Sequence, residues 1–417
     1  MHLFQYKKGE LYAEDVPVRE IAEKYGTPVY IYSYNTLLNH FSAYEQAFNG
    51  FSHITCFAVK ANSTAAILNL FAKKGGGADV VSGGELFRAL KAGIPAEKVV
   101  YAGVGKTEEE IRFALKSGIL MFNVESGDEL REIDRIAGRM KVKAPVALRI
   151  NPDVNAQTHR YIATGLKKYK FGIPIEEAVE HYRLADRLKN ITIMGIHKHI
   201  GSQLTKMSPF VDALKKLLLL VDELEGCGIA VRYLDLGGGL GITYKNEVPP
   251  NPLEFAQKIL PLLKGRALTI VLEPGRYIVG NAGILVTKTL YLKRGPKKEF
   301  VIVDAGMNDL MRPTLYDAYH HIQPVLKNRR KEITADVVGP ICESGDFLAL
   351  GRKIPKVLRG EYLAVMSAGA YGFSMSSTYN SRPRLAEVMV KGGQHALIHK
   401  RETYKDLIKG ESLPEFI

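Results

Sequence analysis

Short apolar runs alternate with helical patterns along the first two thirds of the chain. The segments between the apolar runs repeat apolar residues at helical spacing, and one of them, residues 107–118, opens with a Thr cap and an acidic first turn and closes on a Gly. Alternation of strand and helix predicts βαβ units and a parallel sheet. The eight predicted strands are His53–Val59, Ala78–Val81, Lys98–Gly103, Ile119–Val124, Pro145–Ile150, Ile191–His199, Val231–Leu236 and Leu268–Glu273.

The number of predicted strands favours a closed barrel over an open sheet. Eight strands within roughly 220 residues agree with the ~250 residues of a (β/α)8 barrel. A doubly wound sheet is the alternative, but GGGLGI at residues 237–242 does not fit the dinucleotide fingerprint GxGxxG, because Ile242 occupies its last position. We therefore expect an α/β fold with a TIM-type barrel over residues 35–281.

After about residue 282 the pattern changes to strands separated by turns, with little helical periodicity. This pattern predicts a C-terminal all-β domain over residues 282–417, and the N-terminal segment, residues 1–34, is expected to join it. The Pro-rich stretch at residues 245–255 is predicted to be a loop. The strand-like runs cover residues 283–293, 299–305, 335–342, 353–367 and 384–400.

Composition narrows the class of protein. The 417 residues are 46% hydrophobic and 24% charged, as in ordinary globular proteins. The net charge of +13 is carried by no run of five basic residues, so nucleic-acid binding is not expected, and part of the charge could face an anionic cofactor or substrate. Three scattered cysteines without CxxC spacing favour neither a disulfide framework nor a zinc site. No signal-peptide pattern or membrane span is predicted, so we expect a cytoplasmic protein.

Polar or Gly-rich residues follow six of the eight predicted strands. Active sites of β/α barrels lie at the C-terminal ends of the strands, where successive strand ends form one rim. These residues are therefore expected to face one mouth of the barrel. They are Lys60, residues 82–85, Arg149 with Asn151, His197 with His199, residues 237–241, and residues 273–276.

Each of these features has both a structural and a chemical interpretation. Lys60 is either a lysine that extends to solvent or an amine that forms a Schiff base in a dry pocket. GGGLG is either a tight turn or a row of amides that binds phosphate. Glu273 pairs either with Arg276 or another cation of the barrel, or with a ring nitrogen. His197 and His199 share a strand face, but a metal site needs a third ligand, and none is expected. Amine, phosphate loop, carboxylate and imidazole together fit pyridoxal phosphate.

Nine motifs, spread in order over nearly the whole chain, resemble the fold-type III pyridoxal-phosphate decarboxylases. The resemblance implies an alanine-racemase-like barrel with a β-domain. It also implies a head-to-tail homodimer in which the partner chain completes each active site. The motifs are FAVKAN, GADVVSGGEL, RINPDVNAQTHRYIATGLKKYKFGI, GIHKHIGSQ, LDLGGGLGI, EPGR, MRPTLYDA, CESGD and GAYGFSMSSTYNSRPR.

The resemblance also implies a role for individual cofactor-binding residues. Lys60 would hold the cofactor aldehyde, His199 would stack on the pyridine ring, Glu273 would pair with the ring nitrogen, and Asp79 would support the site. The expected phosphate ligands are Ser202, Gly238, Gly239, Gly275 and Arg276, with Tyr371 assisting.

Further residues are implied in catalysis and substrate binding. Cys342 would return a proton to the α-carbon, and it would act with Lys60 and His199 as the catalytic set. Cys342 and Glu343 would come from the partner subunit. The groups expected to bind the far end of the substrate are Arg276, Arg312, Tyr316, Glu343 and Tyr371.

The residues at the ring nitrogen and the distal end favour one reaction within this family. Alanine racemases place an arginine where Glu273 stands, and a carboxylate there favours the electron sink that decarboxylation requires. Ornithine-type enzymes share the tyrosine after EPGR, Tyr277, but carry Asp at the position of Glu343 and lack Arg312. A substrate without a distal carboxylate would leave a buried Arg312 unpaired, which costs several kcal/mol on the order of a broken buried ion pair.

We therefore expect decarboxylation of meso-2,6-diaminopimelate to L-lysine and CO2, the last step of lysine biosynthesis. The alternatives are decarboxylation of ornithine, arginine or carboxynorspermidine on the same fold, or a protein that carries the cofactor without catalysis. The latter would need neither Cys342 nor the distal arginines.

Overall fold

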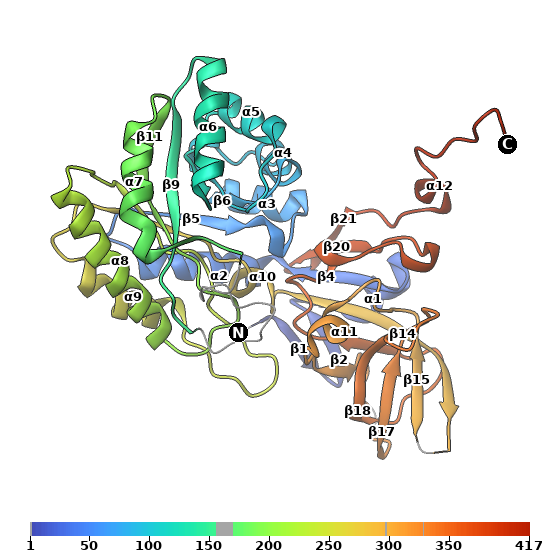
Figure 1. The fold of residues 1–417 in the computed structure, drawn as a ribbon. Coiled ribbons are helices and arrows are strands. Elements are labelled where there is room, and N and C mark those ends of the chain that lie inside the picture. Colours follow the sequence, from blue (N-terminus) through green and yellow to red (C-terminus); the bar gives the residue numbers. More distant parts are fainter. Residues whose placement is uncertain (1, 156–169, 297, 328) are drawn as a thin grey trace. The chain divides into compact units, whose positions relative to one another are not determined.

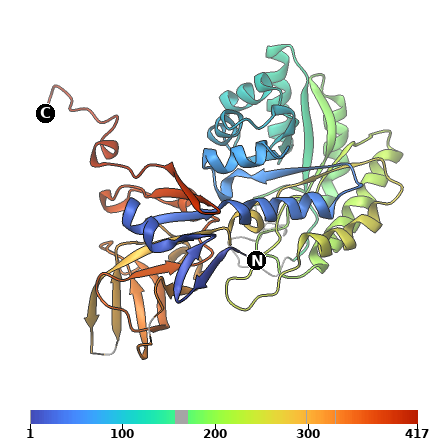
Figure 2. The ribbon, with the colours of Figure 1, turned by 180° about the vertical axis from the view of Figure 1, so that it is seen from behind.

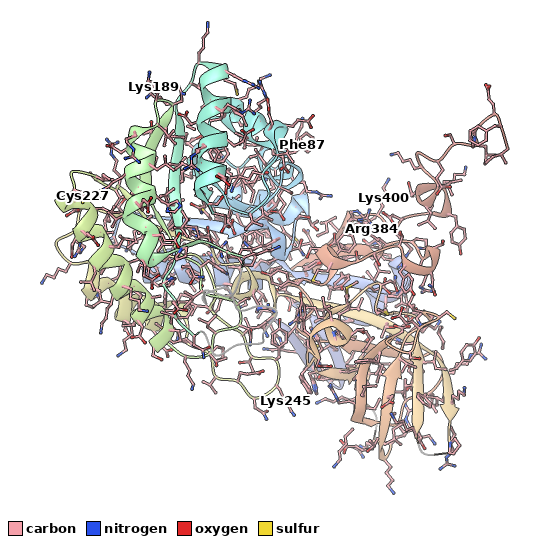
Figure 3. The ribbon with its side chains drawn as sticks, in the orientation of Figure 1. Phe87, Lys189, Cys227, Lys245, Arg384 and Lys400 are labelled. Carbon is pink, nitrogen blue, oxygen red and sulfur yellow. The ribbon has the colours of Figure 1, made fainter. Side chains whose placement is uncertain are left out.

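The computed structural model describes residues 2–155, 170–296, 298–327 and 329–417, and it divides into two compact units. The barrel unit comprises Leu38–Thr243 and Glu247–Ile278, and the β unit comprises Met1–Leu37, Tyr244–Asn246 and Val279–Ile417. Figures 1 and 2 show the fold from opposite sides, and Figure 3 adds the side chains in the orientation of Figure 1. Residues 156–169, which belong to the third motif of the family resemblance, lie outside the described residues.

The barrel unit contains the predicted closed parallel barrel. Each strand pairs in parallel with the next, and pairing of β8 with β9 closes the ring. A short extra strand, β10 (Ile173–Pro174), pairs in parallel with the last residues of β9. The (β/α)8 fold is thus confirmed. Its strands are β5 (His53–Ala58), β6 (Gly77–Val80), β7 (Val99–Tyr101), β8 (Met121–Val124), β9 (Ala144–Asn151), β11 (Ile191–His197), β12 (Tyr233–Asp235) and β13 (Thr269–Leu272).

The helices of the barrel unit begin and end at the local signals in the sequence. In α5 (Glu108–Ser117), Thr107 and Glu110 form a reciprocal capping box, and Gly118 ends the helix in the left-handed region. The other helices are α2 (Tyr34–Ala47), α3 (Ala65–Ala72), α4 (Gly83–Lys91), α6 (Gly127–Met140), α7 (Ala178–Arg187), α8 (Ser208–Gly226), α9 (Pro252–Ile259) and the short α10 (Arg276–Val279).

The prediction of a loop over residues 245–255 is wrong for its last four residues. There α9 begins at Pro252, and Asn251 caps it through a capping box with Glu254. Proline is well tolerated at the first helical position, because that amide has no helical partner in any case. Pro252 is therefore the first residue of a helix rather than part of a loop.

The β unit is built around a sheet in which the N-terminal and C-terminal segments pair. Strand β4 (Val29–Ser33) pairs antiparallel with β14 (Gly283–Arg294) and parallel with β20 (Ala386–Lys391). The N-terminal segment therefore joins the β-domain, as expected. The sheet order is β18-β17-β15-β14-β4-β20-β21, with β15 (Glu299–Val303), β17 (Glu332–Val338), β18 (Phe347–Pro355) and β21 (Gln394–His399).

Smaller elements complete the β unit. Strand β19 (Tyr362–Val365) pairs with β14 and with β16 (Ile322–Pro324), and a separate three-stranded sheet contains β1 (Phe4–Lys7), β2 (Glu10–Ala13) and β3 (Val16–Pro17). The helices of the β unit are α1 (Val18–Tyr25), α11 (Arg312–Tyr316) and α12 (Tyr404–Leu407). Among the residues that the structure describes, no helix has the length and apolar character of a membrane span.

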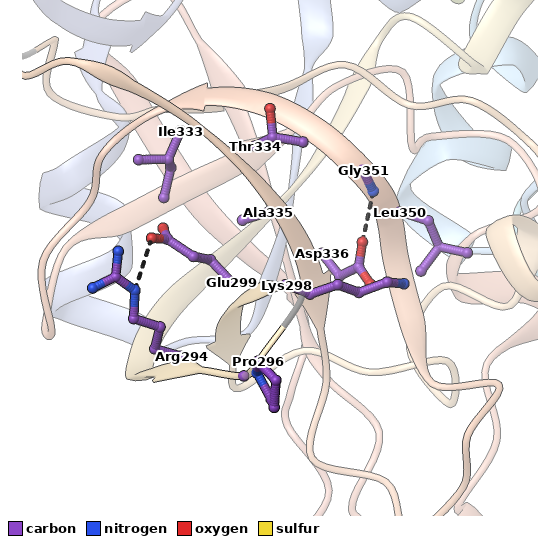
Figure 4. Close-up of a pocket in the computed structure, with 11 residues that line it drawn as sticks. Arg294, Pro296, Lys298, Glu299, Ile333, Thr334, Ala335, Asp336, Leu350 and Gly351 are labelled. Atoms are coloured by element: carbon purple, nitrogen blue, oxygen red, sulfur yellow. Dashed lines mark hydrogen bonds and ion pairs between the residues drawn. The ribbon is translucent and has the colours of Figure 1, made fainter.

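A hollow of about 550 Å³ lies on the sheet formed by β15, β17 and β18 (Figure 4). Its charged side chains are engaged with one another. The Lys298 ammonium lies 2.9 Å from a carboxylate oxygen of Asp336, and the Asp336 carboxylate also accepts from the Gly351 amide at 2.6 Å. Arg294 and Glu299 form a looser pair at 3.8 Å. The hollow contains none of the predicted site residues.

Candidate active site

Lys60 lies in a single 3-10 turn, Val59–Ala61, directly after strand β5. Its ammonium forms an ion pair with Asp79, which is fully buried near the end of the neighbouring strand β6. About a third of the Lys60 side chain remains exposed. The parallel register of β5 and β6 therefore supplies the charge partner that allows a lysine to follow a buried strand.

Glu273 follows strand β13, and its carboxylate lies among polar side chains from other strands. Its Oε2 lies 3.5 Å from His197 Nε2 and 4.0 Å from His199 Nδ1, and its Oε1 accepts from the Asn123 amide at 3.3 Å. Burial alone would raise the pKa of Glu273, but the interaction with His197 and the positive charge of Lys60 outweigh burial and lower it. Glu273 is therefore an ionised carboxylate inside the barrel.

Asp235, at the end of β12, lies beside Glu273 and differs from it in charge state. Its Oδ1 accepts from the Gly237 amide at 2.9 Å, and its Oδ2 accepts from the Asn123 side chain at 3.1 Å. Burial and the charge of Glu273 raise the pKa of Asp235 well above its usual range. Two adjacent buried carboxyl groups do not both ionise readily, so Asp235 holds a proton while Glu273 is charged.

Three of these groups have the spacing of a metal site. One donor atom from each of His197, Asp235 and Glu273 lies within 4.8 Å of the others. Both oxygens of Asp235 already accept hydrogen bonds. We interpret this cluster as one that orients the Glu273 carboxylate. The Asn123 amide donates to both Asp235 and Glu273 and so links the two carboxyl groups.

His199 presents a neutral ring beside the glycine loop. The Gly238 amide donates to His199 Nδ1 at 3.2 Å, so this nitrogen is the acceptor and the ring proton resides on Nε2. Burial and the positive charge of Arg149 lower the pKa of His199 well below its usual value. An uncharged planar imidazole is suited to stacking on an aromatic ring.

Two glycines of the loop after β12 have no room for a side chain. A Cβ on Gly238 would lie 2.2 Å from the carbonyl oxygen of Glu273, and Gly239 has a φ of +124° with the Gly201 oxygen 2.7 Å from the Cβ position. Gly238 and Gly239 therefore pack directly against neighbouring backbone, where any side chain would clash. Ser202 and Arg276 are in contact: Arg276 Nε and Nη2 donate to Ser202 Oγ at 3.2 and 3.1 Å.

Five predicted residues belong to the β unit: Arg312, Tyr316, Cys342, Glu343 and Tyr371. Arg312 is buried at the start of α11, whereas Cys342 and Glu343 are exposed. The Cys342 amide donates to Asn380 Oδ1 at 2.8 Å. The Tyr379 hydroxyl donates to Glu343 Oε2 at 2.7 Å. Residues 379–380 therefore fix the conformation of the CESGD loop.

Tyr371 is half-buried and has a positive φ of 56°. For a bulky residue this conformation is strained, and such strain is usually kept where a side chain must point in one direction. Tyr316 is half-buried at the end of α11, where Asp317 ends the helix in the left-handed region.

Sequence reasoning missed Asn123 and Asp235. Both are polar residues within apolar strand runs, and both are fully buried in the structure. A buried polar residue needs a hydrogen-bond partner, so a polar residue inside an apolar strand run indicates a buried polar contact. It could not identify the partner, because Asn123 and Asp235 are 112 residues apart.

The residues of the barrel unit fit pyridoxal phosphate. A lysine with a carboxylate partner, an ionised buried carboxylate and a neutral imidazole gather at the strand ends. The glycine loop carries backbone amides, which are the kind of donor that a phosphate requires. These are the donors and acceptors that an aldehyde, a pyridinium nitrogen and a phosphate each require.

Comparison with known proteins agrees with this fit. Residues 34–280 match the family model described as "Pyridoxal-dependent decarboxylase, pyridoxal binding domain". The chain belongs to the family of pyridoxal-dependent decarboxylases; it is a carboxy-lyase and its cofactor is pyridoxal phosphate.

Within this family, the chain is similar to proteins named diaminopimelate decarboxylase. It is 53% identical to the one of Aquifex aeolicus over 97% of this chain and 96% of the relative, and 52% identical to that of Pseudomonas aeruginosa over 99% of both. A solved structure of the Helicobacter pylori enzyme complexed with L-lysine has a TM-score of 0.91 at 43% identity, covering 94% of this chain and 98% of that chain. The M. jannaschii enzyme in complex with L-lysine has a TM-score of 0.94 at 40% identity, covering 99% and 98%.

Proposed function

We propose that this protein decarboxylates meso-2,6-diaminopimelate to L-lysine and CO2, the closing step of lysine biosynthesis. The observation that carries the proposal is the ionised Glu273 buried within the barrel that also holds the Lys60–Asp79 pair. Full-length relatives that carry the name of this activity support it. Two related structures contain L-lysine, which is the expected product.

When bound, pyridoxal phosphate supplies an electron sink for the carbanion that remains after CO2 has left. Lys60 is the amine that would hold the cofactor aldehyde until the substrate amine replaces it. Glu273 would keep a proton on the ring nitrogen, which a neutral acid could not do. His199 would face the ring, and Asp79 would accept the Lys60 ammonium. We propose that Ser202, Gly238, Gly239, Gly275 and Arg276 hold the phosphate, with assistance from Tyr371.

Cys342 is proposed to return a proton from its thiol to the α-carbon after CO2 loss. Its exposure supports this role, because a proton donor must reach the reacting carbon. The Asn380 side chain, which accepts from the Cys342 amide, holds the loop in one conformation. Arg276 and Arg312 would bind the distal carboxylate as a cation pair, Glu343 would bind the distal ammonium, and Tyr316 and Tyr371 would contact the substrate.

We further propose a cytoplasmic homodimer in which Cys342 and Glu343 of one chain serve the site of the other. An interface between two chains would cover large apolar side chains that are exposed in the single chain near its C-terminus. Leu413, Phe416 and Ile417 are 90, 89 and 88% exposed. Functionally, residues 35–281 would bind the cofactor, and residues 282–417 with 1–34 would form the second domain.

The assay that tests this function measures CO2 release from meso-diaminopimelate by the purified holoenzyme. Ornithine, arginine and carboxynorspermidine are measured in parallel under the same conditions. The proposal expects a kcat/KM for meso-diaminopimelate at least about a hundredfold above the others, since the distal carboxylate is read by buried arginines. A higher kcat/KM for any of the other three would reassign the substrate, and no CO2 release from any would refute decarboxylation.

A further inference from the structure

The Arg312 guanidinium is held by two rings inside the β unit. Arg312 Nη1 lies 2.7 Å from His320 Nε2, and the guanidinium carbon lies 4.7 Å from the centre of the Tyr244 ring. The Tyr244 and His320 rings also meet edge to face at 5.4 Å. All three side chains are at least nine-tenths buried, with exposed fractions of 6% for Arg312, 0% for His320 and 9% for Tyr244.

Hydrogen-bond geometry determines the tautomer of His320. Its Nδ1 lies 2.9 Å from the Met366 carbonyl oxygen, which is only an acceptor, so Nδ1 carries the proton. Its Nε2 faces the guanidinium, which is only a donor, so Nε2 presents a lone pair. His320 is therefore a neutral imidazole with both nitrogens engaged. A proton added at Nε2 would place two donors face to face.

The backbone that carries His320 is fixed as well. Arg352 Nη1 donates to the His320 carbonyl oxygen at 2.6 Å, and the Arg352 guanidinium lies 4.0 Å from the centre of the Tyr319 ring. Met366, whose carbonyl accepts from the imidazole, directly follows strand β19. The imidazole is thus tied to the sheet of the β unit on one side and to Arg312 on the other.

From this geometry we propose that His320, supported by Tyr244, is a positioning residue that aims the Arg312 guanidinium at a carboxylate of the bound ligand. Neither contact neutralises the guanidinium charge, because one partner is a neutral imidazole and the other an aromatic face. A planar guanidinium binds a carboxylate through two parallel hydrogen bonds only when its plane is correctly oriented. The inference rests on the proposed function, in which Arg312 binds the distal carboxylate.

L-Lysine and cadaverine separate this role from a merely structural one. Decarboxylation at one end of meso-diaminopimelate leaves the distal carboxylate on L-lysine, whereas cadaverine is the same diamine without it. The holoenzyme is titrated with each ligand by calorimetry, which does not depend on turnover. The variants are His320→Leu, which removes both hydrogen bonds, and His320→Gln, whose amide can accept from Arg312 and donate to Met366. The exposed neighbour His321→Leu is the matched control.

We expect His320→Leu to weaken L-lysine binding about tenfold, the effect of losing one charge-assisted hydrogen bond, and to change cadaverine binding less than about twofold. His320→Gln should recover most of the lysine affinity, and His321→Leu should behave as the wild type. If His320→Leu does not fold, His320→Asn replaces it, since its shorter amide cannot reach both partners.

Equal weakening of both ligands, or an unchanged ratio of their affinities, would overturn the inference. These outcomes differ from a failure of the proposed function. That failure would appear as a wild-type holoenzyme that releases no CO2 from meso-diaminopimelate, whatever the His320 variants bind.

Discussion

Lys60 is the residue on which both cofactor attachment and turnover are proposed to depend. We predict that Lys60→Ala loses the visible absorption of lysine-linked cofactor and turnover together, with kcat falling by at least about 10³-fold, because no other amine is paired with Asp79 in the described site. Absorption spectra and a CO2-release assay measure both effects. Lys74→Ala, an exposed lysine after α3, is the control. Retention of both properties in Lys60→Ala would exclude Lys60 as the anchor.

Glu85 gives a prediction about stability and pH. Burial raises the pKa of Glu85 to about 7, although Lys60 acts in the opposite direction. A carboxyl group whose pKa is higher in the folded state stabilises the fold below its unfolded pKa of about 4.5, and this stability is lost as the pH rises to about 7. Glu85→Gln should therefore become more stable than the wild type across this window, by on the order of 1–3 kcal/mol at pH 7.5.

Thermal melts of both proteins between pH 4.5 and 8 test the Glu85 prediction. The difference in Tm should grow up to about pH 7 and then stay constant. Glu97→Gln, at an exposed position, controls for the loss of one surface carboxylate. A constant difference over the whole range would contradict the assignment of the pKa.

At the scale of elements, the glycine loop after β12 is the clearest case of backbone geometry that serves binding. Gly239→Ala should destabilise the protein by about 1–3 kcal/mol, because alanine is strained at its positive φ and its Cβ meets the Gly201 oxygen. It should also weaken pyridoxal-phosphate binding by the apoenzyme, as measured by spectroscopic titration. Gly226→Ala, in α8 with open space around it, should instead gain roughly 0.5 kcal/mol. If the two variants had the same stability and the same affinity for pyridoxal phosphate, the proposed role of the glycine loop would be contradicted.

The strands themselves were predictable, and their ends less so. All eight barrel strands occur where apolar runs predicted them, because a strand buried on both faces needs a continuous run. Several are shorter than the run: Glu273 lies one residue beyond β13, and His199 lies two beyond β11. The polar residues thus fall at the strand ends rather than strictly beyond them, because Asp79, His197 and Asp235 still belong to their strands.

For the whole molecule, shared active sites predict complementation between two inactive variants. Lys60→Ala and Cys342→Ala should each be inactive as homodimers. When the two are co-expressed, half of the dimers are hybrids, and each hybrid has one site with both residues intact. About a quarter of wild-type activity should therefore return. Sites built within a single chain would restore none, and a monomer by light scattering would contradict the dimer directly.

By itself, the sequence determined the alternation of strands and helices, the entry of the N-terminal segment into the β-domain, and the polar residues at the strand ends that predict a pyridoxal-phosphate site. These are properties of periodicity and of neighbours along the chain. Tertiary structure alone decided that Asn123 ties Asp235 to Glu273 and that His320 orients Arg312. The charge of a buried carboxyl group and the tautomer of a buried imidazole depend on the atoms that the fold brings within about 3 Å, and in the barrel those atoms lie more than a hundred residues apart in the chain.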